Sequence, residues 1–274
     1  MDKHLSSKPI VEELYKNMKL IVPILKDAPS LSIILIDDRD DSKIYVNMKK
    51  KKCLELGIEC NVYSYDNTIS ENIIIKKIKY LNNDDSVSGI MVQLPLPKHL
   101  NTENILSEID EKKDVDGLHL NNLGKIMNNY EPYFYPCTPL SVIKLLEYYK
   151  IDVVGKNIVF VGTGMVNLPL SLMMLNKKAT IIMCNEYTEY IKEKTILADI
   201  LIVACGQSKI IKKDWIKEDV IIIDIGIHKN DGKINGDVDY LDVINKVKYI
   251  TPVPGGVGPL TVCLLMNNCI KSKL

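Results

Sequence analysis

Two kinds of apolar spacing alternate along the first half of the chain. Short runs of consecutive apolar residues are typical of buried strands, and segments whose apolar residues recur every three or four positions are typical of helices. The runs predict strands at residues 31–36, 59–65 and 89–93, and the periodic segments predict helices at 10–25, 42–56, 73–81 and 100–109. Strands that alternate with helices favour a parallel sheet with crossover helices.

An irregular stretch at residues 112–138 interrupts this alternation. Long loops inside compact domains are usually functional. The alternation then restarts, with helices predicted at 139–149, 166–175 and 260–270, strands at 157–161, 180–184, 200–204 and 220–224, and a Pro- and Gly-rich loop at 250–258. We therefore predict an α/β protein of two domains, residues 1–138 and 139–258, with the helix at 259–274 packing back on the first domain.

The composition excludes several kinds of protein. Of the 274 residues, 46% are hydrophobic and 26% are charged, and Lys plus Arg and Asp plus Glu both number 35. A net charge of zero provides no field that would favour nucleic acid or an anionic membrane as a partner. No apolar run is long enough to span a bilayer, and the start of the chain lacks the apolar segment of a signal peptide, so we expect a cytoplasmic protein.

The cysteines and the paired carboxylates do not predict a metal site. Seven cysteines are scattered without a Cys-x-x-Cys pair, which favours reduced thiols over a disulfide framework or a zinc site. Asp114 and Asp116 flank a valine, but no His or Cys stands at ligand spacing beside them. We therefore expect no metal.

The second predicted domain carries half of a dinucleotide fingerprint. A β-rich run ends at Gly162, Thr163 and Gly164, and a predicted helix follows. Glycines there allow a pyrophosphate to approach the helix N-terminus, although a ligand-free tight turn explains Gly-x-Gly alone equally well. The next strand ends near Glu186, which is either a ribose-binding carboxylate or an exposed loop residue. A later strand ends at Gly206, at the sheet edge where open α/β sheets hold ligands.

The first predicted domain carries the candidate chemistry. Ser42, Tyr45 and Lys49 are spaced i, i+3 and i+7, so they share one face of the predicted helix. Most such faces are merely solvated, but this one begins just after a strand end. Gln93 ends another strand, ahead of a Leu-Pro-Leu-Pro sequence that keeps the chain extended. A lysine near a glutamine in a crevice can have a lowered pKa and take part in proton transfer.

Five motifs occur in order along nearly the whole chain. They are Ser-Lys-Ile-Tyr-Val at 42–46 with Lys49, Val-Gln-Leu-Pro-Leu-Pro at 92–97, Lys-Asp-Val-Asp-Gly at 113–117, Pro-Cys-Thr-Pro at 136–139 and Thr-Pro-Val-Pro-Gly-Gly-Val-Gly-Pro at 251–259. The last motif is highly specific. In these motifs the chain resembles the bifunctional methylenetetrahydrofolate dehydrogenase/methenyltetrahydrofolate cyclohydrolase family.

The resemblance implies a folate site in a cleft between the two domains. It implies that Lys49 assists proton transfer and activates the water that opens the methenyl bridge, and that Gln93 hydrogen-bonds and tunes this lysine. It further implies that Tyr45 stacks on the folate rings, that Ser42 supports the cluster, and that Asp116 receives the pterin amino and ring N–H groups in a charge-assisted pair. Pro254, Gly255 and Gly256 would line the folate side of the cleft.

The resemblance also implies a nicotinamide cofactor, NAD or NADP, on the second domain, where its ring takes part in hydride transfer with the methylene carbon. The residues expected to contact it are Gly162, Thr163, Gly164, Glu186, Gly206 and Ile227. Family members are generally homodimers paired through the second domain, so we expect a homodimer.

The departures from the family pattern concentrate on the cofactor side. The family's nucleotide turn usually reads Gly-Arg-Ser and is one residue longer, whereas Thr163 and Gly164 occupy the Arg and Ser places here and Asn167 replaces a later glycine. The next strand usually ends Cys-His-Ser and here ends Cys-Asn-Glu at 184–186. Since the missing Arg and Ser hold the 2′-phosphate of NADP, and Glu186 would repel it, we expect NAD to be preferred.

Three hypotheses follow from this pattern. The protein is a bifunctional enzyme that oxidises methylenetetrahydrofolate and hydrolyses the methenyl product to 10-formyltetrahydrofolate, or a cyclohydrolase with a degenerate dinucleotide site, or a folate-binding protein without turnover. The presence of Lys49, Gln93 and Asp116 argues against the third hypothesis. Binding of a dinucleotide separates the first two.

Overall fold

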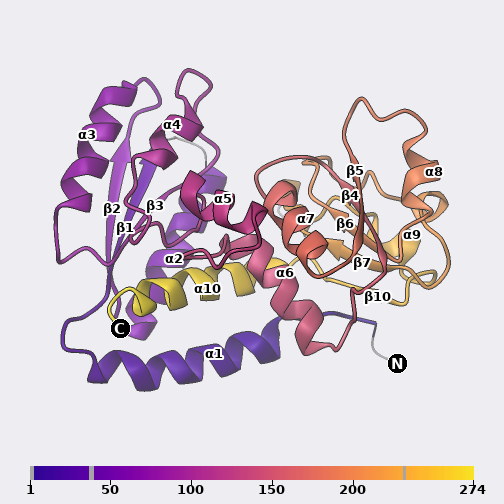
Figure 1. The fold of residues 1–274 in the computed structure, drawn as a ribbon, viewed down its shortest axis with the longest axis horizontal. Coiled ribbons are helices and arrows are strands. Elements are labelled where there is room, and N and C mark those ends of the chain that lie inside the picture. Colours follow the sequence, from indigo (N-terminus) through magenta and orange to yellow (C-terminus); the bar gives the residue numbers. More distant parts are fainter. Residues whose placement is uncertain (1–2, 37–39, 231–232) are drawn as a thin grey trace. The chain divides into compact units, whose positions relative to one another are not determined.

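The structure is a computed structural model that describes residues 3–36, 40–230 and 233–274. The chain divides into two compact units (Figure 1). The first unit comprises Glu12–Cys137 and Val262–Leu274, and the second comprises Met1–Val11 and Thr138–Thr261. Each unit is built on its own parallel sheet.

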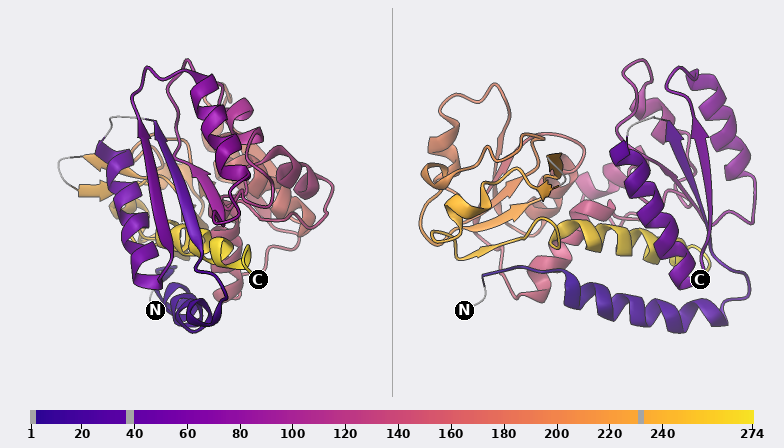
Figure 2. Two further views of the ribbon diagram at one scale, coloured as in Figure 1. Left: turned by 90° about the vertical axis from the view of Figure 1, so that its left-hand side faces the viewer. Right: turned by 180° about the vertical axis from the view of Figure 1, so that it is seen from behind.

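The first unit contains a three-stranded parallel sheet in the order β2-β1-β3. Its strands are β1 (Ser30–Ile36), β2 (Glu59–Tyr65) and β3 (Gly89–Val92), and its crossover helices are α2 (Asp40–Leu56) and α3 (Glu71–Asn82). The central strand β1 is buried throughout, as expected for a consecutive apolar run. The helices α2 and α3 lie on opposite sides of the strands (Figure 2). Side chains of α3 and of α4 (Thr102–Ser107) form one core with β1 and β3.

Two further helices belong in part to the first unit. The helix α1 (Lys8–Ile21) is followed by a short 3-10 turn, η1 (Val22–Ile24). The last helix, α10 (Val257–Lys271), packs in this unit from Val262 onward: Cys53 Sγ donates to Met266 Sδ at 3.2 Å, and Asn268 Nδ2 donates to the Val115 carbonyl at 2.9 Å. A segment that lies at the end of the sequence thus completes the core behind α2.

The stretch at 112–138 is not irregular throughout, contrary to expectation. It contains α5 (Leu120–Met127), whose amino-terminal end is capped by His119, with Asn121 N–H donating to the ring Nδ1 at 3.1 Å. The helix is only eight residues long, and its apolar positions are interrupted by Asn and Gly, so its helical spacing was not recognised.

The second unit contains a five-stranded parallel sheet in the order β10-β7-β6-β4-β5. Its strands are β4 (Asn157–Val161), β5 (Thr180–Cys184), β6 (Ile200–Val203), β7 (Ile221–Asp224) and β10 (Tyr249–Ile250), and its main helices are α6 (Cys137–Tyr148) and α7 (Asn167–Asn176). The chain runs outward from β4 to β5 and then returns to the other side of β4 for β6. The strand order therefore reverses at β4, which is where doubly wound sheets bind dinucleotides.

Several short elements of the second unit were not predicted. They are α8 (Ile191–Thr195), the 3-10 turn η2 (Lys213–Trp215), the antiparallel hairpin of β8 (His228–Asn230) and β9 (Lys233–Asn235), and α9 (Tyr240–Val243). Each has five residues or fewer, which is too short for a periodic pattern to emerge from the surrounding polar sequence.

By its contacts the amino-terminal segment belongs to the second unit, whereas residues 1–138 were expected to form one domain. Leu5 N–H donates to the Ile250 carbonyl at 2.9 Å, and Ile250 N–H donates to the Lys3 carbonyl at 2.9 Å. The Leu5 side chain is fully buried. Backbone pairing with β10 explains the assignment, and a short polar segment gives no sign of such pairing in its own sequence.

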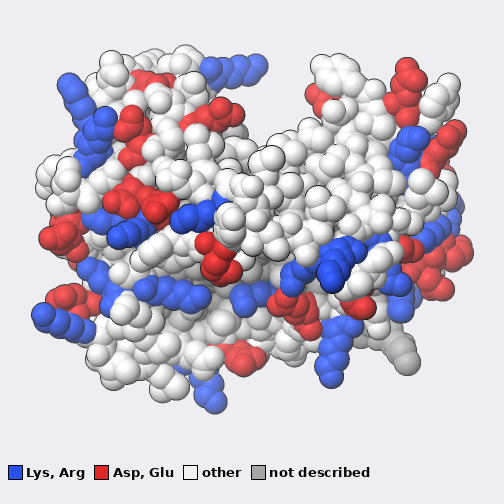
Figure 3. Space-filling view, in the orientation of Figure 1, with Lys and Arg blue, Asp and Glu red and all other residues white. Residues whose placement is uncertain are grey.

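The surface and the helices of the described residues are ordinary. Side chains of both charge signs are interspersed on the face in view (Figure 3). Among the described residues, no helix combines the length and the hydropathy needed to cross a bilayer, and no group of three His, Cys, Asp or Glu side chains is arranged to hold a metal ion.

Candidate active site

Lys49 is the centre of a buried polar cluster in the first unit. It lies on α2, its residue is only 8% exposed, and its Nζ donates to Gln93 Oε1 at 2.8 Å and contacts Met91 Sδ at 3.4 Å. Gln93 follows β3 directly and is itself fixed, because its Nε2 donates to the Leu94 carbonyl at 2.9 Å. A helix and a strand end thus bring together two side chains that are 44 positions apart.

The environment of Lys49 shifts its protonation. Burial lowers the pKa of the Lys49 amine, and the negative charge of Asp116 opposes that shift. In turn, burial raises the pKa of Asp116, and the Lys49 charge opposes that rise. A buried amine that is favoured in its neutral form can act as a base, which an exposed lysine at neutral pH cannot do.

The loop that carries Asp116 is fixed by its neighbour. Asp114 is almost completely buried, and its carboxylate accepts hydrogen bonds from Gly117 N–H at 3.2 Å, His119 N–H at 2.7 Å and Asn122 Nδ2 at 3.1 Å. Burial raises the pKa of Asp114 to about 6. The two carboxylates therefore differ in their surroundings. Asp114 accepts hydrogen bonds from its own loop and from Asn122, whereas Asp116 lies close enough to Lys49 to affect its pKa.

The remaining residues expected on the folate side are placed as follows. Ser42 and Tyr45 lie on α2 with Lys49, Ser42 buried and Tyr45 half-buried. Pro254, Gly255 and Gly256 lie in the loop between β10 and α10. Gly256 is buried against Pro252, with its N–H donating to the Pro252 carbonyl at 2.7 Å, and the Gly255 carbonyl accepts from Ser7 N–H at 3.1 Å.

The nucleotide turn follows β4, as expected, and its first glycine is required by geometry. Gly162 has φ of 103°, and a Cβ on it would overlap the carbonyl of Ala204. Thr163 and Gly164 are exposed, and a Cβ on Gly164 would meet open space. The turn thus approaches β6 closely at its first residue and leaves room for a ligand at its third.

Asn167 begins α7 directly after this turn. Its Nδ2 donates to the Val161 carbonyl at 3.1 Å and the Gly162 carbonyl at 2.9 Å, so it closes the turn from within. Its Oδ1 is buried and has no hydrogen-bond partner among the described residues. The Asn167 side chain therefore braces the turn.

The other expected cofactor residues lie at the carboxyl ends of three strands. Glu186 is exposed in the turn after β5, where Asn185 Oδ1 accepts from Tyr187 N–H at 3.0 Å. Gly206 follows β6 with φ of 71°, and Ile227 follows β7 with 45% of its surface exposed. These positions fit a dinucleotide laid along the sheet edge, although no cation occupies the Arg place of the turn.

Sequence reasoning assigned no role to two buried carboxylates at this sheet edge, Asp224 and Asp237. Both are almost completely buried, and both accept backbone N–H groups of the loops that follow β6 and β7. Their partners are up to 32 positions away, so no local spacing identifies them.

Two family profiles match the chain. Residues 3–116 match the catalytic domain, and residues 136–274 the NAD(P)-binding domain, of tetrahydrofolate dehydrogenase/cyclohydrolase. The chain belongs to the bifunctional methylenetetrahydrofolate dehydrogenase/cyclohydrolase family. As a member of this family it is a methylenetetrahydrofolate dehydrogenase and methenyltetrahydrofolate cyclohydrolase of one-carbon metabolism, with an NAD(P)-binding domain.

Individual members of the family are similar over their whole length. "Bifunctional protein FolD" of Vesicomyosocius okutanii is 43% identical over 270 residues, which cover 98% of this chain and 97% of that protein. The crystal structure of the bifunctional enzyme FolD from Campylobacter jejuni is 42% identical with a TM-score of 0.93, covering 98% and 97% of the two chains. The dehydrogenase-cyclohydrolase of Trypanosoma brucei, complexed with NADP and an inhibitor, is 29% identical with a TM-score of 0.92, covering 98% and 96%.

Proposed function

We propose that the cluster around Lys49 is the place where the one-carbon bridge of the folate reacts. The observation that carries this proposal is a buried amine, hydrogen-bonded to a neutral glutamine oxygen at 2.8 Å, with a carboxylate near enough to influence its pKa. The substrate of the first reaction is 5,10-methylenetetrahydrofolate, and its methenyl product is the substrate of the second reaction, which yields 10-formyltetrahydrofolate.

Lys49 acts in the hydrolysis as a proton carrier. Its neutral amine accepts a proton from water as the water oxygen attacks the methenyl carbon. The resulting ammonium returns a proton to the folate nitrogen that leaves when the C–N bond of the adduct breaks. Gln93 directs one N–H of the amine toward its own Oε1 and so orients the lone pair. Acid–base catalysis by one residue contributes on the order of 10²–10⁴-fold.

Asp116 acts on both the substrate and Lys49. When ionised, its carboxylate accepts the N–H groups of the pterin, and its charge raises the pKa that burial lowers in Lys49. Tyr45, on the same helix, supplies a ring for stacking on the folate, and Ser42 supports the cluster.

In the oxidation, a bound dinucleotide would supply the hydride acceptor, and residues of the second unit would hold the dinucleotide in place. Gly162 admits the pyrophosphate to the amino-terminal end of α7, with Thr163 and Gly164 beside it. Glu186 lies on the β5 side, and Gly206 and Ile227 lie on the side of β6 and β7.

The electrostatics of the turn favour NAD over NADP. Neither Thr163 nor Gly164 can pair with a 2′-phosphate, and the exposed Glu186 repels it while accepting bonds from free ribose hydroxyls. Lys177 and Lys178 follow the carboxyl end of α7, which is ten residues and therefore about 15 Å long, so they stand at the far end of the helix from the turn.

A cofactor titration of dehydrogenase activity tests this function. We expect oxidation of methylenetetrahydrofolate with NAD, and hydrolysis of the methenyl product by the same preparation. A protein that hydrolyses the methenyl substrate but uses neither NAD nor NADP would have a degenerate dinucleotide site. The homodimer and the cytoplasmic location that the family resemblance implies belong to the same proposal, and the molar mass in solution tests the first of them.

A further inference from the structure

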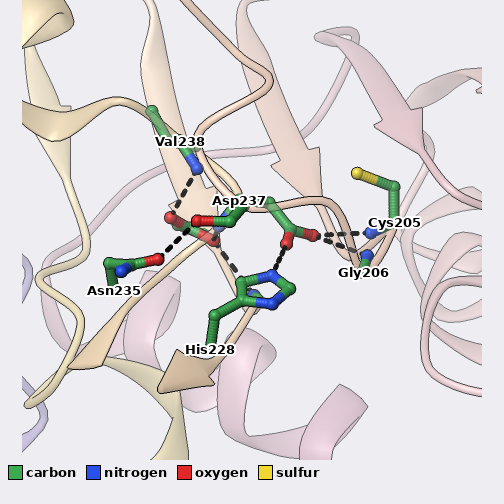
Figure 4. Close-up of polar contacts among 9 residues, drawn as sticks. Cys205, Gly206, His228, Asn235, Asp237 and Val238 are labelled. Carbon is green, nitrogen blue, oxygen red and sulfur yellow. Dashed lines mark hydrogen bonds and ion pairs between the residues drawn. The ribbon is translucent and has the colours of Figure 1, made fainter. Parts of the chain in front are cut away.

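Asp237 joins two loops of the second unit that are distant in sequence. It is fully buried, and its Oδ2 accepts hydrogen bonds from Cys205 N–H at 2.7 Å and Gly206 N–H at 3.0 Å. Its Oδ1 lies 2.6 Å from Nε2 of His228, on β8 (Figure 4). One carboxylate thus fixes the turn after β6 and an imidazole on the segment after β7.

A second carboxylate holds Asp237 in place. Asp224, at the end of β7, accepts from Asp237 N–H and Gly226 N–H through Oδ1 and from Val238 N–H through Oδ2, each at 3.0 Å. Gly226 and Gly236 have no room for a side chain, since a Cβ on either would overlap one of the two carboxylates. Such dense packing makes the placement of the Asp237 side chain rigid.

The loops that Asp237 fixes lie on one side of the strand reversal. The turn after β4 receives the pyrophosphate, and Glu186 on the β5 side suits the adenosine ribose. The opposite half of a dinucleotide must then run along the ends of β6 and β7, on the other side of β4. Gly206 and Ile227 are at those ends, and His228 follows Ile227 directly.

The geometry points to Asp237 as a positioning residue for the nicotinamide half of the cofactor, acting through His228. The carboxylate accepts a hydrogen bond from Nε2–H of the imidazole, which leaves Nδ1 as an acceptor for a ribose hydroxyl or carboxamide N–H of the nicotinamide nucleotide. Figure 4 shows the second ring nitrogen of His228 turned away from Asp237, and the His228 side chain is 21% exposed, so a ligand can reach it. This inference rests on the proposed cofactor contacts of Gly206 and Ile227.

The test compares NAD with ADP, which retains the adenosine and the phosphates but lacks the nicotinamide nucleotide. Calorimetric titrations of His228→Ala and Asp237→Asn should show NAD binding weakened about tenfold, as expected when one hydrogen-bond partner is lost, with ADP binding within twofold of the unaltered protein. Asp214→Asn is the matched control, because it makes the same chemical change at an exposed carboxylate of the same unit that pairs with Lys192. It should alter neither affinity.

Each outcome decides between distinct conclusions. Retained ADP binding shows that the second unit of a variant is folded, and methenyl hydrolysis reports separately on the first unit. Equal weakening of NAD and ADP, or unchanged NAD binding in His228→Ala, overturns the positioning role. If Asp237→Asn fails to fold, His228→Ala still decides, since it leaves both backbone bonds of Asp237 in place. An unaltered protein that binds ADP and no nicotinamide dinucleotide would overturn the proposed cofactor site itself.

Discussion

The two units of this enzyme recognise their ligands with different parts of the chain. In the first unit the proposed chemistry depends on side chains: the amine of Lys49, the amide of Gln93 and the carboxylate of Asp116. In the second unit the glycine turn after β4 offers backbone, and buried carboxylates hold the backbone of the loops after β6 and β7.

The largest expected effect is on the hydrolysis rate, through Lys49 of the first unit. Lys49→Met removes the amine while keeping a flexible apolar side chain in the buried site, so methenyl hydrolysis should fall by about 10²–10⁴-fold. The measurement is the hydrolysis rate of the purified variant, with the melting temperature as a check on folding. Lys51→Met, at an exposed position of the same helix, is the control and should retain activity. A near-normal rate in Lys49→Met would remove this residue from the mechanism.

The next effect concerns the second unit and depends on the charge of Glu186. NAD should be preferred over NADP on the order of 100-fold in kcat/KM, because Glu186 repels a 2′-phosphate that no cation of the turn meets. Steady-state kinetics with each cofactor give the ratio. Glu186→Ser should narrow it by improving the use of NADP. Comparable or better activity with NADP in the unaltered protein would refute the charge argument.

A smaller loss is expected from the substrate contact of the first unit. Asp116→Asn should weaken binding of a folate analogue by about 1–3 kcal/mol, since a pterin N–H loses its charged acceptor. Titration of the analogue measures the loss, and thermal unfolding of the ligand-free variant measures any effect on stability. If affinity is unchanged and the melting temperature falls steeply, Asp116 has a structural role instead.

The smallest expected effect is a displacement of the pH profile. Because burial lowers the pKa of Lys49 from its usual value of 10.5, the neutral amine forms at lower pH, and enzyme-catalysed hydrolysis should rise to its plateau below that value. Asp116 raises the same pKa, so Asp116→Asn should move the rising limb to still lower pH. The rate is measured across pH after subtraction of the uncatalysed reaction. An unmoved limb would mean that a group other than Lys49 titrates.

Sequence alone predicts the parts of this structure that are local. The strands β2, β4 and β5 have the expected bounds because each is a β-rich run ended by turn residues. The eight-residue helix α5 and the hairpin of β8 and β9 were missed because they are short. For the same reason the pairing of the amino-terminal segment with β10 could not be anticipated.

In the candidate site, too, only the local features could be predicted from the sequence. The spacing of Ser42, Tyr45 and Lys49 suggests a shared helix face, and α2 contains all three. The contact of Lys49 with Gln93 spans 44 positions, and only the family resemblance linked the two residues beforehand. Asp237 and His228 had neither a motif nor a resemblance to indicate them, since long-range polar contacts leave no local pattern. Their interaction could be found only from coordinates.

The position of α10 has a consequence for how the protein is made. Most of the second unit, Thr138–Thr261, lies in the sequence between the two parts of the first unit, whose core is closed by Met266 and Asn268 only after that stretch has been synthesised. In the second unit, the amino-terminal segment can form its backbone hydrogen bonds only after Ile250 has been synthesised. The first unit therefore cannot finish folding until the last helix has emerged from the ribosome. The apolar surface behind α2 stays uncovered until the last helix arrives, so the nascent chain is exposed to aggregation late in its synthesis.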